Sequence, residues 1–112
     1  MKKIMMSLLL LAAPASAMDK KELLGAWALD GDRSQKAPDG NTAGALAKVE
    51  LKPDGTFEAL YGLGGTWKME GGKLLVTWRN SFRHDEEAIL DGAWLKLPSP
   101  SMKGKFCYLR RQ

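Results

Sequence analysis

Residues 65–78 read GTWKMEGGKLLVTW, and this stretch decides the fold class. On both sides of Gly71-Gly72, apolar and polar residues alternate with a period of two, which is typical of strands with one buried face. The apolar face comprises Trp67, Met69, Leu74, Val76 and Trp78. Two adjacent glycines supply the positive φ angles that a tight turn requires. The stretch therefore predicts an antiparallel β-hairpin.

The chain on either side repeats this pattern of short apolar runs and turns. Pro53-Asp54-Gly55 and Asp91-Gly92 provide turn chemistry, and no useful helix-period segment follows residue 23. The expected strands are residues 23–29, 47–51, 56–60, 66–69, 74–78, 88–90, 94–97 and 105–109. We predict an all-β antiparallel up-and-down meander of about eight short strands closed into a small barrel, because closure removes both sheet edges. A two-sheet sandwich of the same strands is the alternative.

Residues 30–44 form a long connection that is rich in Asp, Gly, Ser, Asn and Pro. Loops of this length are uncommon in small domains, and rim loops are where ligands and partners usually bind. We expect a mobile loop at the barrel mouth. Asp30-Gly31-Asp32 matches only the opening of a calcium-loop pattern, so no calcium site is expected.

Residues 1–17 have the three regions of a secretory signal peptide that is cleaved on export. Lys2 and Lys3 are basic, residues 4–13 are apolar, and Ala15-Ser16-Ala17 matches the cleavage site. The sequence therefore predicts an exported protein, periplasmic or secreted, with a single mature domain of residues 18–112. The apolar run is shorter than the roughly 20 residues of a membrane span, and we expect no span in the mature chain.

The charge of the mature chain excludes nucleic acid as a partner. Without the two lysines of the signal peptide, 15 basic residues stand against 13 acidic ones, and the two signs are interspersed. The one positive cluster comprises Lys103, Lys105, Arg110 and Arg111. We interpret this cluster as part of a solvated strand edge, since lysines on edge strands prevent edge-to-edge pairing with another chain.

Gly25-Ala26-Trp27 lies on the expected first strand and is followed by a long loop, a meander and a late basic residue. This arrangement resembles the lipocalin, or calycin, group of small β-barrels. The resemblance implies that Trp27 plugs one end of the barrel and that Arg110 packs across its ring, with Arg111 as the alternative.

Two other groups of barrels show local similarity. Residues 76–80 with Gly65-Thr66-Trp67 are similar to parts of the avidin family, in which tryptophans line a biotin pocket. The polar biotin ligands of that family have no counterpart beside Trp27, so we do not expect biotin binding. The G-x-W strand also resembles that of periplasmic metalloprotease inhibitors, but those barrels carry a disulfide and this chain has one cysteine.

The aromatic residues are the candidates for the barrel interior. They comprise Trp27, Trp67, Trp78, Trp94, Phe57 and Tyr61. Eight strands leave room either for a core filled by large side chains or for a cavity that holds one small ligand. Under the second interpretation, the ligand-binding residues are Phe57, Tyr61, Trp67 and Trp78.

Titratable groups concentrate only at residues 84–87. His84 and Glu86 would share a strand face, but a catalytic zinc site needs three protein ligands. No second histidine completes a triad, no serine lies in a G-x-S-x-G context, and no glycine loop precedes a helix as a phosphate site requires. Cys107 cannot form a disulfide within the chain and is expected to be a buried apolar side chain.

We therefore expect no catalytic residue, no metal and no cofactor. The sequence predicts a non-catalytic exported binding protein whose barrel holds a small apolar or aromatic ligand. The alternative is a protein-interaction or inhibitor module that acts through the barrel rim on another exported protein.

Overall fold

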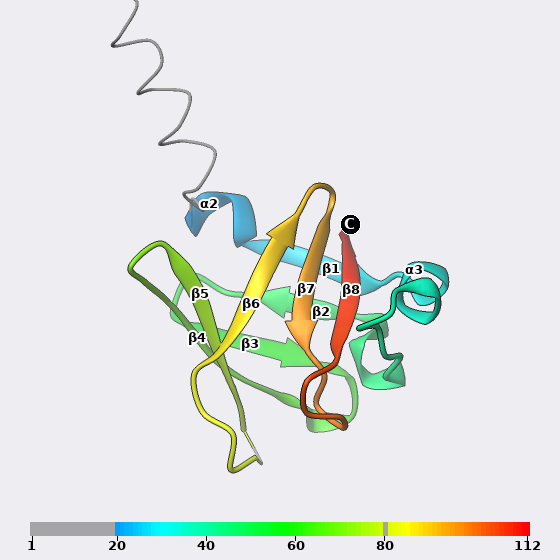
Figure 1. Cartoon of the computed structure of the whole chain (residues 1–112). Helices are drawn as coiled ribbons and strands as arrows, with labels where there is room; N and C mark the ends of the chain where they lie inside the picture. Colours follow the sequence, from blue (N-terminus) through cyan, green and yellow to red (C-terminus); the bar gives the residue numbers. More distant parts are fainter. Residues whose placement is uncertain (1–19, 80) are drawn as a thin grey trace, which may run out of the picture.

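The computed structural model describes residues 20–79 and 81–112, in which eight antiparallel strands close into one barrel (Figure 1). The strands follow one another in chain order, and the last pairs with the first. They are β1 (Gly25–Leu29), β2 (Val49–Leu51), β3 (Thr56–Ala59), β4 (Gly64–Glu70), β5 (Lys73–Trp78), β6 (Glu86–Asp91), β7 (Trp94–Pro98) and β8 (Phe106–Arg111). The prediction of an up-and-down barrel is confirmed, and closure excludes the sandwich. The predicted signal peptide, residues 1–17, lies outside the described residues.

Within residues 20–79 and 81–112, four short helical segments accompany the strands. They are α2 (Lys20–Leu23), α3 (Gly31–Lys36), η1 (Gly44–Ala47) and η2 (Leu60–Gly62). Two predicted strands are shorter than expected, because Leu23 belongs to α2 and Ala47 to η1. Gly25 has a φ of 111°, which favours glycine, and it lets the chain turn from α2 into β1. None of the helices in the described ranges is long and apolar enough to cross a membrane.

The hairpin at residues 65–78 has the predicted register. Trp67 lies opposite Val76, and Gly65 lies opposite Trp78. Opposed residues of an antiparallel pair point to the same side of the sheet, so all three large side chains face the interior. Gly65 is required there, because a Cβ at this position would lie 1.9 Å from the carbonyl oxygen of Thr77.

The interior side chains form one contiguous cluster of buried residues. Its members are Leu23, Trp27, Leu46, Val49, Leu51, Phe57, Trp67, Leu74, Val76, Trp78, Ala88, Leu95, Leu97, Cys107 and Leu109. Leu23 comes from α2 at one end of the barrel, and Leu46 comes from η1 at the other. Both are fully buried. Apolar side chains therefore extend through the barrel from one end to the other.

Trp27 closes the end of the barrel at which β1 begins, which we call the plugged end. Its indole Nε1 donates a 3.0 Å hydrogen bond to the Leu23 carbonyl, and the side chain is buried. The guanidinium that crosses the indole ring belongs to Arg111, at 4.3 Å from the ring centroid. Arg110, the residue we favoured, is largely exposed and lies 4.0 Å from Asp30 instead. Arg111 is the residue that crosses Trp27 because it lies opposite Trp27 across β1 and β8, so the two side chains project from the same side of the sheet.

Residues 30–41, which we call the strap, complete the barrel wall beyond the end of β1. The Ser34 hydroxyl accepts a hydrogen bond from the Tyr108 backbone N–H at 2.9 Å. The Phe106 backbone N–H donates to the Asp39 carbonyl at 2.8 Å. Thus, beyond the end of β1, the strap forms hydrogen bonds with β8 in place of β1; it lies beside β8 in Figure 1. The expectation of a mobile mouth loop is wrong for this part of the connection, because backbone and side-chain hydrogen bonds hold it to a strand.

The prediction of a solvated strand edge at the C-terminal end of the chain is also wrong, because β8 pairs with β1 on one side and with β7 on the other. The four basic residues assigned to that edge do not form a cluster. Lys103 and Lys105 precede β8, whereas Arg110 and Arg111 lie at its far end. The barrel therefore divides the positive charge between its two ends.

Candidate functional site

Four connections meet at the end of the barrel opposite the plugged end. They comprise residues 30–48, 60–63, 79–85 and 99–105, and we call this end the loop end. The plugged end carries α2, the tight hairpin turns and the C-terminus (Figure 1). Since the longer and more varied connections gather at the loop end, it is the first place to look for a binding surface.

Three of the four predicted ligand-binding residues, Phe57, Trp67 and Trp78, belong to the buried interior cluster, and the fourth, Tyr61, does not. Phe57 is fully buried and packs edge to face against Trp78, with ring centroids 5.0 Å apart. Trp67 is also buried inside the barrel, but Tyr61 is 84% exposed in η2 at the loop end. Trp94, another interior candidate, faces outward and donates a 3.0 Å hydrogen bond to the Asp30 carboxylate.

The polar atoms of the interior tryptophans are bonded within the protein. Trp67 Nε1 lies 3.0 Å from both the Lys52 and the Thr56 carbonyl oxygens. Trp78 Nε1 donates a 3.2 Å hydrogen bond to the Pro98 carbonyl. Ligand pockets usually present a few free polar groups that fix the ligand's orientation. The N–H groups of these two indoles already donate hydrogen bonds to backbone carbonyls of the protein. The contacts are those of tryptophans that belong to a packed core.

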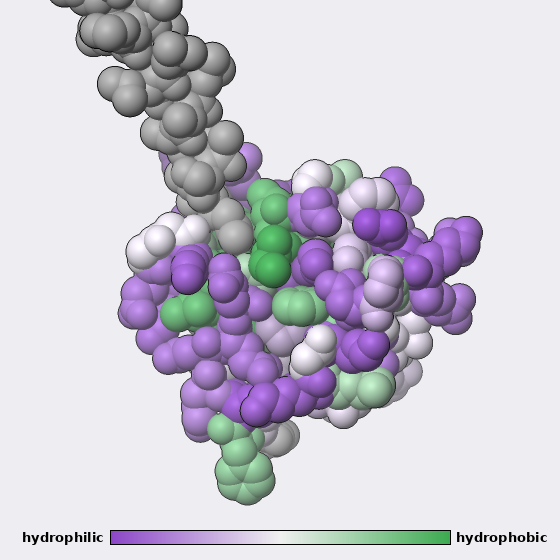
Figure 2. Space-filling view, viewed as in Figure 1, coloured by the Kyte–Doolittle hydropathy of each residue, from purple (hydrophilic) through white to green (hydrophobic). Residues whose placement is uncertain are grey.

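Three loops of the loop end each expose one large apolar side chain. Tyr61 projects from η2, Phe82 is 100% exposed in loop 79–85, and Met102 is 48% exposed in loop 99–105. Within the described part of the chain, the other exposed large apolar residue is Ile89, on the outer wall of β6. Figure 2 shows a mainly hydrophilic face with apolar patches on the barrel wall, at the upper centre and the left, and an apolar projection at the bottom, where the β5–β6 loop lies in Figure 1. Three of the four exposed large apolar side chains of the described residues therefore lie on loops at one end.

Tyr61 is held outward by a strained backbone. Its φ of 61° and ψ of 31° place it in the left-handed region, which costs a residue with a Cβ on the order of 1 kcal/mol or more. Arg79 fixes this turn from the neighbouring loop, because its Nη1 donates a 3.0 Å hydrogen bond to the Gly62 carbonyl. The same guanidinium lies 3.4 Å from the Glu58 carboxylate. The η2 turn and the β5–β6 loop are thus joined.

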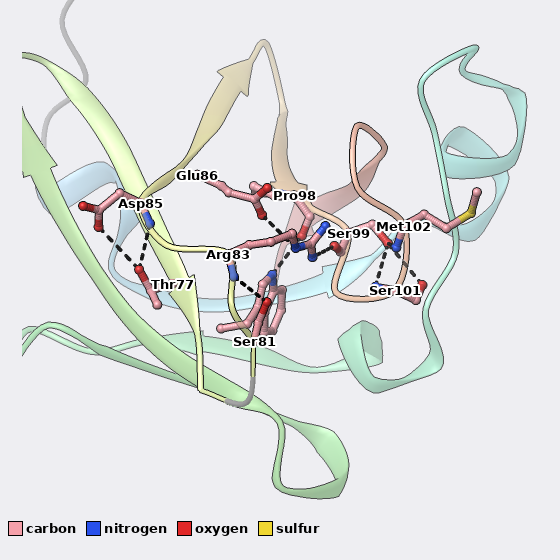
Figure 3. Close-up of polar contacts among 10 residues, drawn as sticks. Thr77, Ser81, Arg83, Asp85, Glu86, Pro98, Ser99, Ser101 and Met102 are labelled. Atoms are coloured by element: carbon pink, nitrogen blue, oxygen red, sulfur yellow. Dashed lines mark hydrogen bonds and ion pairs between the residues drawn. The ribbon is translucent and has the colours of Figure 1, made fainter.

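Arg83 joins the β5–β6 loop to the loop between β7 and β8 (Figure 3). Its guanidinium donates a hydrogen bond to the Ser99 carbonyl, and Nε lies 3.5 Å from Glu86. Glu86 lies opposite Val76, so its carboxylate faces the mouth of the barrel. The side chains of Arg83 and Glu86 are only 18% and 22% exposed, so this ion pair is largely withdrawn from solvent.

Ser99 joins the β7–β8 loop to the strap. Its hydroxyl donates a 2.7 Å hydrogen bond to Asn41 Oδ1 and accepts the backbone N–H groups of Ser101 and Met102. The Asn41 amide in turn donates to Met102 Sδ at 3.1 Å. Each of the four connections is therefore bonded to a neighbour.

Asp39 fastens the strap to the outer face of the barrel. Its carboxylate accepts hydrogen bonds from Lys96 Nζ at 2.9 Å and from the Tyr108 hydroxyl at 2.8 Å. These two donors, Lys96 first, lower the pKa of Asp39 below its usual value. Burial alone would lower the pKa of Lys96, but its hydrogen bonds to Asp39 and Tyr108 outweigh burial and raise it. Both charges of the pair are therefore favoured at neutral pH.

The groups that could support catalysis do not converge. His84 is exposed in its loop, and the described residues contain no group of three His, Cys, Asp or Glu side chains that could hold a metal ion. Cys107 is fully buried, as predicted. Burial raises the pKa of its thiol to about 11, although the Ser99 side chain acts in the opposite direction. A thiol in this state is a poor nucleophile at neutral pH.

Comparison with protein-family models, curated proteins and solved structures finds no match to this chain. The candidate site therefore rests on the geometry of the barrel. Phe82 and Met102 were absent from the residues that the sequence singled out. The sequence did contain a signal for Phe82, because it is an isolated aromatic residue in the polar segment 79–87. A search for interior residues does not select such a residue.

Proposed function

We propose that this chain is an exported, non-catalytic interaction module that binds another protein through the loop end of a calycin-like barrel. The observation that carries the proposal is the placement of Tyr61, Phe82 and Met102 on three cross-linked loops at one end. Exposed apolar side chains that gather on a soluble protein mark interaction sites more often than scattered ones do.

The interior argues for a protein partner ahead of a small ligand. Phe57 and Trp78 pack against each other, and buried side chains from α2 and η1 cover the two ends. A small ligand would have to displace packed apolar side chains to enter, whereas a partner at the loop end needs no such change. A small apolar molecule inside the barrel is the second candidate. To bind it, the barrel would have to open, which would break the packing contacts between these buried side chains.

Native mass spectrometry of the protein purified from its exported fraction tests the proposal. We expect a protein to remain bound to the wild type and to the Ile89→Ser control, and to be lost from the Tyr61→Ser/Phe82→Ser/Met102→Ser variant. Ile89→Ser removes an exposed apolar side chain from the barrel wall, away from the loops. A bound small molecule whose removal shifts the tryptophan emission, with no bound protein, would instead place the ligand inside the barrel.

A further inference from the structure

We propose that Met102 is a modification site at which a peroxide adds oxygen to one face of the thioether sulfur, so that one of the two sulfoxide epimers forms in excess. Two observations carry the proposal. Met102 is exposed, and the Asn41 amide already occupies one side of its sulfur. The proposal goes beyond the proposed function and does not depend on it, because the modification needs no partner protein.

Met102 is the accessible methionine of the described residues. Its side chain is 48% exposed in loop 99–105. Met69, the other methionine in residues 20–79 and 81–112, is partly buried and packs against the core. A thioether reacts with peroxide where the oxidant can reach the sulfur, and methionine sulfoxide is a common product. In the folded protein Met102 should therefore react ahead of Met69.

The Asn41 amide is held in one orientation beside the sulfur. The Ser99 hydroxyl accepts the backbone N–H groups of Ser101 and Met102, so both of its lone pairs are used and its own proton is left to donate. The amide atom 2.7 Å from this hydroxyl must then be the acceptor, Oδ1. The donor, Nδ2, is thereby turned toward Met102 Sδ, which lies 3.1 Å away. The Asn41 backbone N–H donates to the Phe106 carbonyl at 2.8 Å, so the residue is also anchored to β8.

This amide makes the two lone pairs of the sulfur unequal. Attack of an oxidant on one lone pair gives one sulfoxide epimer, and attack on the other gives the mirror arrangement at sulfur. The lone pair that accepts the Asn41 N–H is the less available, because the hydrogen bond must break before an oxidant can approach. The strap also lies on that side, since the Met102 side chain extends toward it (Figure 3). The oxidant should therefore react with the lone pair that points away from Asn41.

The reaction balances with hydrogen peroxide as the oxidant. The sulfur lone pair attacks one peroxide oxygen, so that the S–O bond forms and the O–O bond breaks. The departing hydroxide takes the proton of the transferred oxygen and leaves as water. The sulfur loses two electrons, and the peroxide gains them. The product is a polar side chain that can be reduced back, and a different reductase acts on each epimer.

Stereochemical analysis of the oxidised protein tests the proposal. The folded protein is treated with hydrogen peroxide to low conversion and digested with trypsin, which releases residues 97–103 with Met102 as their one methionine. The peptide is then divided between two methionine sulfoxide reductases, each specific for one epimer, and mass spectrometry measures the fraction that stays oxidised. We expect one epimer in about threefold excess or more, because attack on the bonded lone pair must first break a hydrogen bond. The same peptide oxidised after digestion is the control, and it should give nearly equal amounts of the two epimers.

Asn41→Asp is the variant that isolates the amide donor. It keeps an oxygen to accept from Ser99 and replaces the nitrogen that donates to Met102. The excess should disappear in Asn41→Asp, and it should persist in Thr42→Ala, which changes an exposed neighbour. Asn41→Ala removes the donor without adding a charge, so it is the second variant if the new carboxylate disturbs the strap.

Three outcomes would overturn the proposal. Equal amounts of the two epimers from the folded wild type would mean that the Asn41 amide does not protect one lone pair. An excess that survives in both Asn41→Asp and Asn41→Ala would assign the stereochemistry to other groups. Oxidation of Met69, followed in residues 69–73 of the same digest, ahead of Met102 would remove Met102 as the preferred site.

Discussion

Replacing Phe57 with Ala measures whether the barrel interior is a core or a lined cavity. The Phe57 side chain is fully buried, and removing at least about 150 Å² of apolar surface from water at about 25 cal/mol per Å² corresponds to roughly 4 kcal/mol. Its edge-to-face contact with Trp78, at 5.0 Å, adds about 0.5–1.5 kcal/mol. Since Ala retains part of the apolar contact, we expect the free energy of unfolding to fall by about 3–5 kcal/mol.

Urea unfolding, followed by tryptophan fluorescence and circular dichroism, provides the assay. The midpoint should fall while the dependence on urea stays constant, because the surface exposed on unfolding hardly changes. Phe57→Leu is the milder variant if Phe57→Ala does not fold, and it should cost less than the alanine variant because it keeps most of the side-chain volume. A loss below about 1 kcal/mol in Phe57→Ala would refute the packed core and return the interior to consideration as a ligand site.

Three further predictions test the plug, the strap and the Asp39 pair. Trp27→Ala should destabilise the protein by about 3–5 kcal/mol, whereas Arg111→Ala, which removes an exposed cation–π contact, should cost only about 0.5–1 kcal/mol in the same urea assay. Gly40→Ala should cost about 1–3 kcal/mol or more, because its Cβ would lie 1.9 Å from a carbonyl oxygen, and Gly31→Ala in α3, with open space around its Cβ, is the matched control that should be neutral or slightly stabilising. Because the pKa of Asp39 is lower in the folded state than its ordinary value of 3.8, its contribution to stability is present above that value and is lost as the pH falls through the folded pKa. Urea midpoints measured from pH 7 to pH 2 should therefore fall less steeply for Asp39→Asn than for wild type, and parallel curves would contradict the assignment.

The strand order of this barrel could be predicted from local signals. The alternation in residues 65–78 and the turns at Gly71-Gly72 and Asp91-Gly92 each specify contacts between neighbouring segments, and the structure contains those hairpins. Burial of Cys107 followed from its place between apolar neighbours on a strand. Closure was a correct inference because a meander of this length would otherwise leave two open edges.

Contacts between distant segments could not be read in the same way. The choice between Arg110 and Arg111 depends on the register of β8 against β1, and a shift of one residue reverses which side chain faces the interior. The strap looks like a loop in sequence because its hydrogen-bond partners, Tyr108 and Phe106, lie far along the chain. Phe82 was missed because a residue with no burial leaves no periodic signal.

Closure of the barrel by its own first and last strands has a consequence for how the chain acquires its structure. Arg111 donates a hydrogen bond to the Leu24 carbonyl across 87 positions of sequence, so the final contacts form only after nearly the whole chain is present. Pairings between such distant segments slow folding, since the entropy of closing a long loop is lost before the contacts are gained. Removing only the last few residues would deprive β1 of one of its two partner strands and open the barrel, so truncation at the C-terminus should be far more damaging than the length of the deletion suggests.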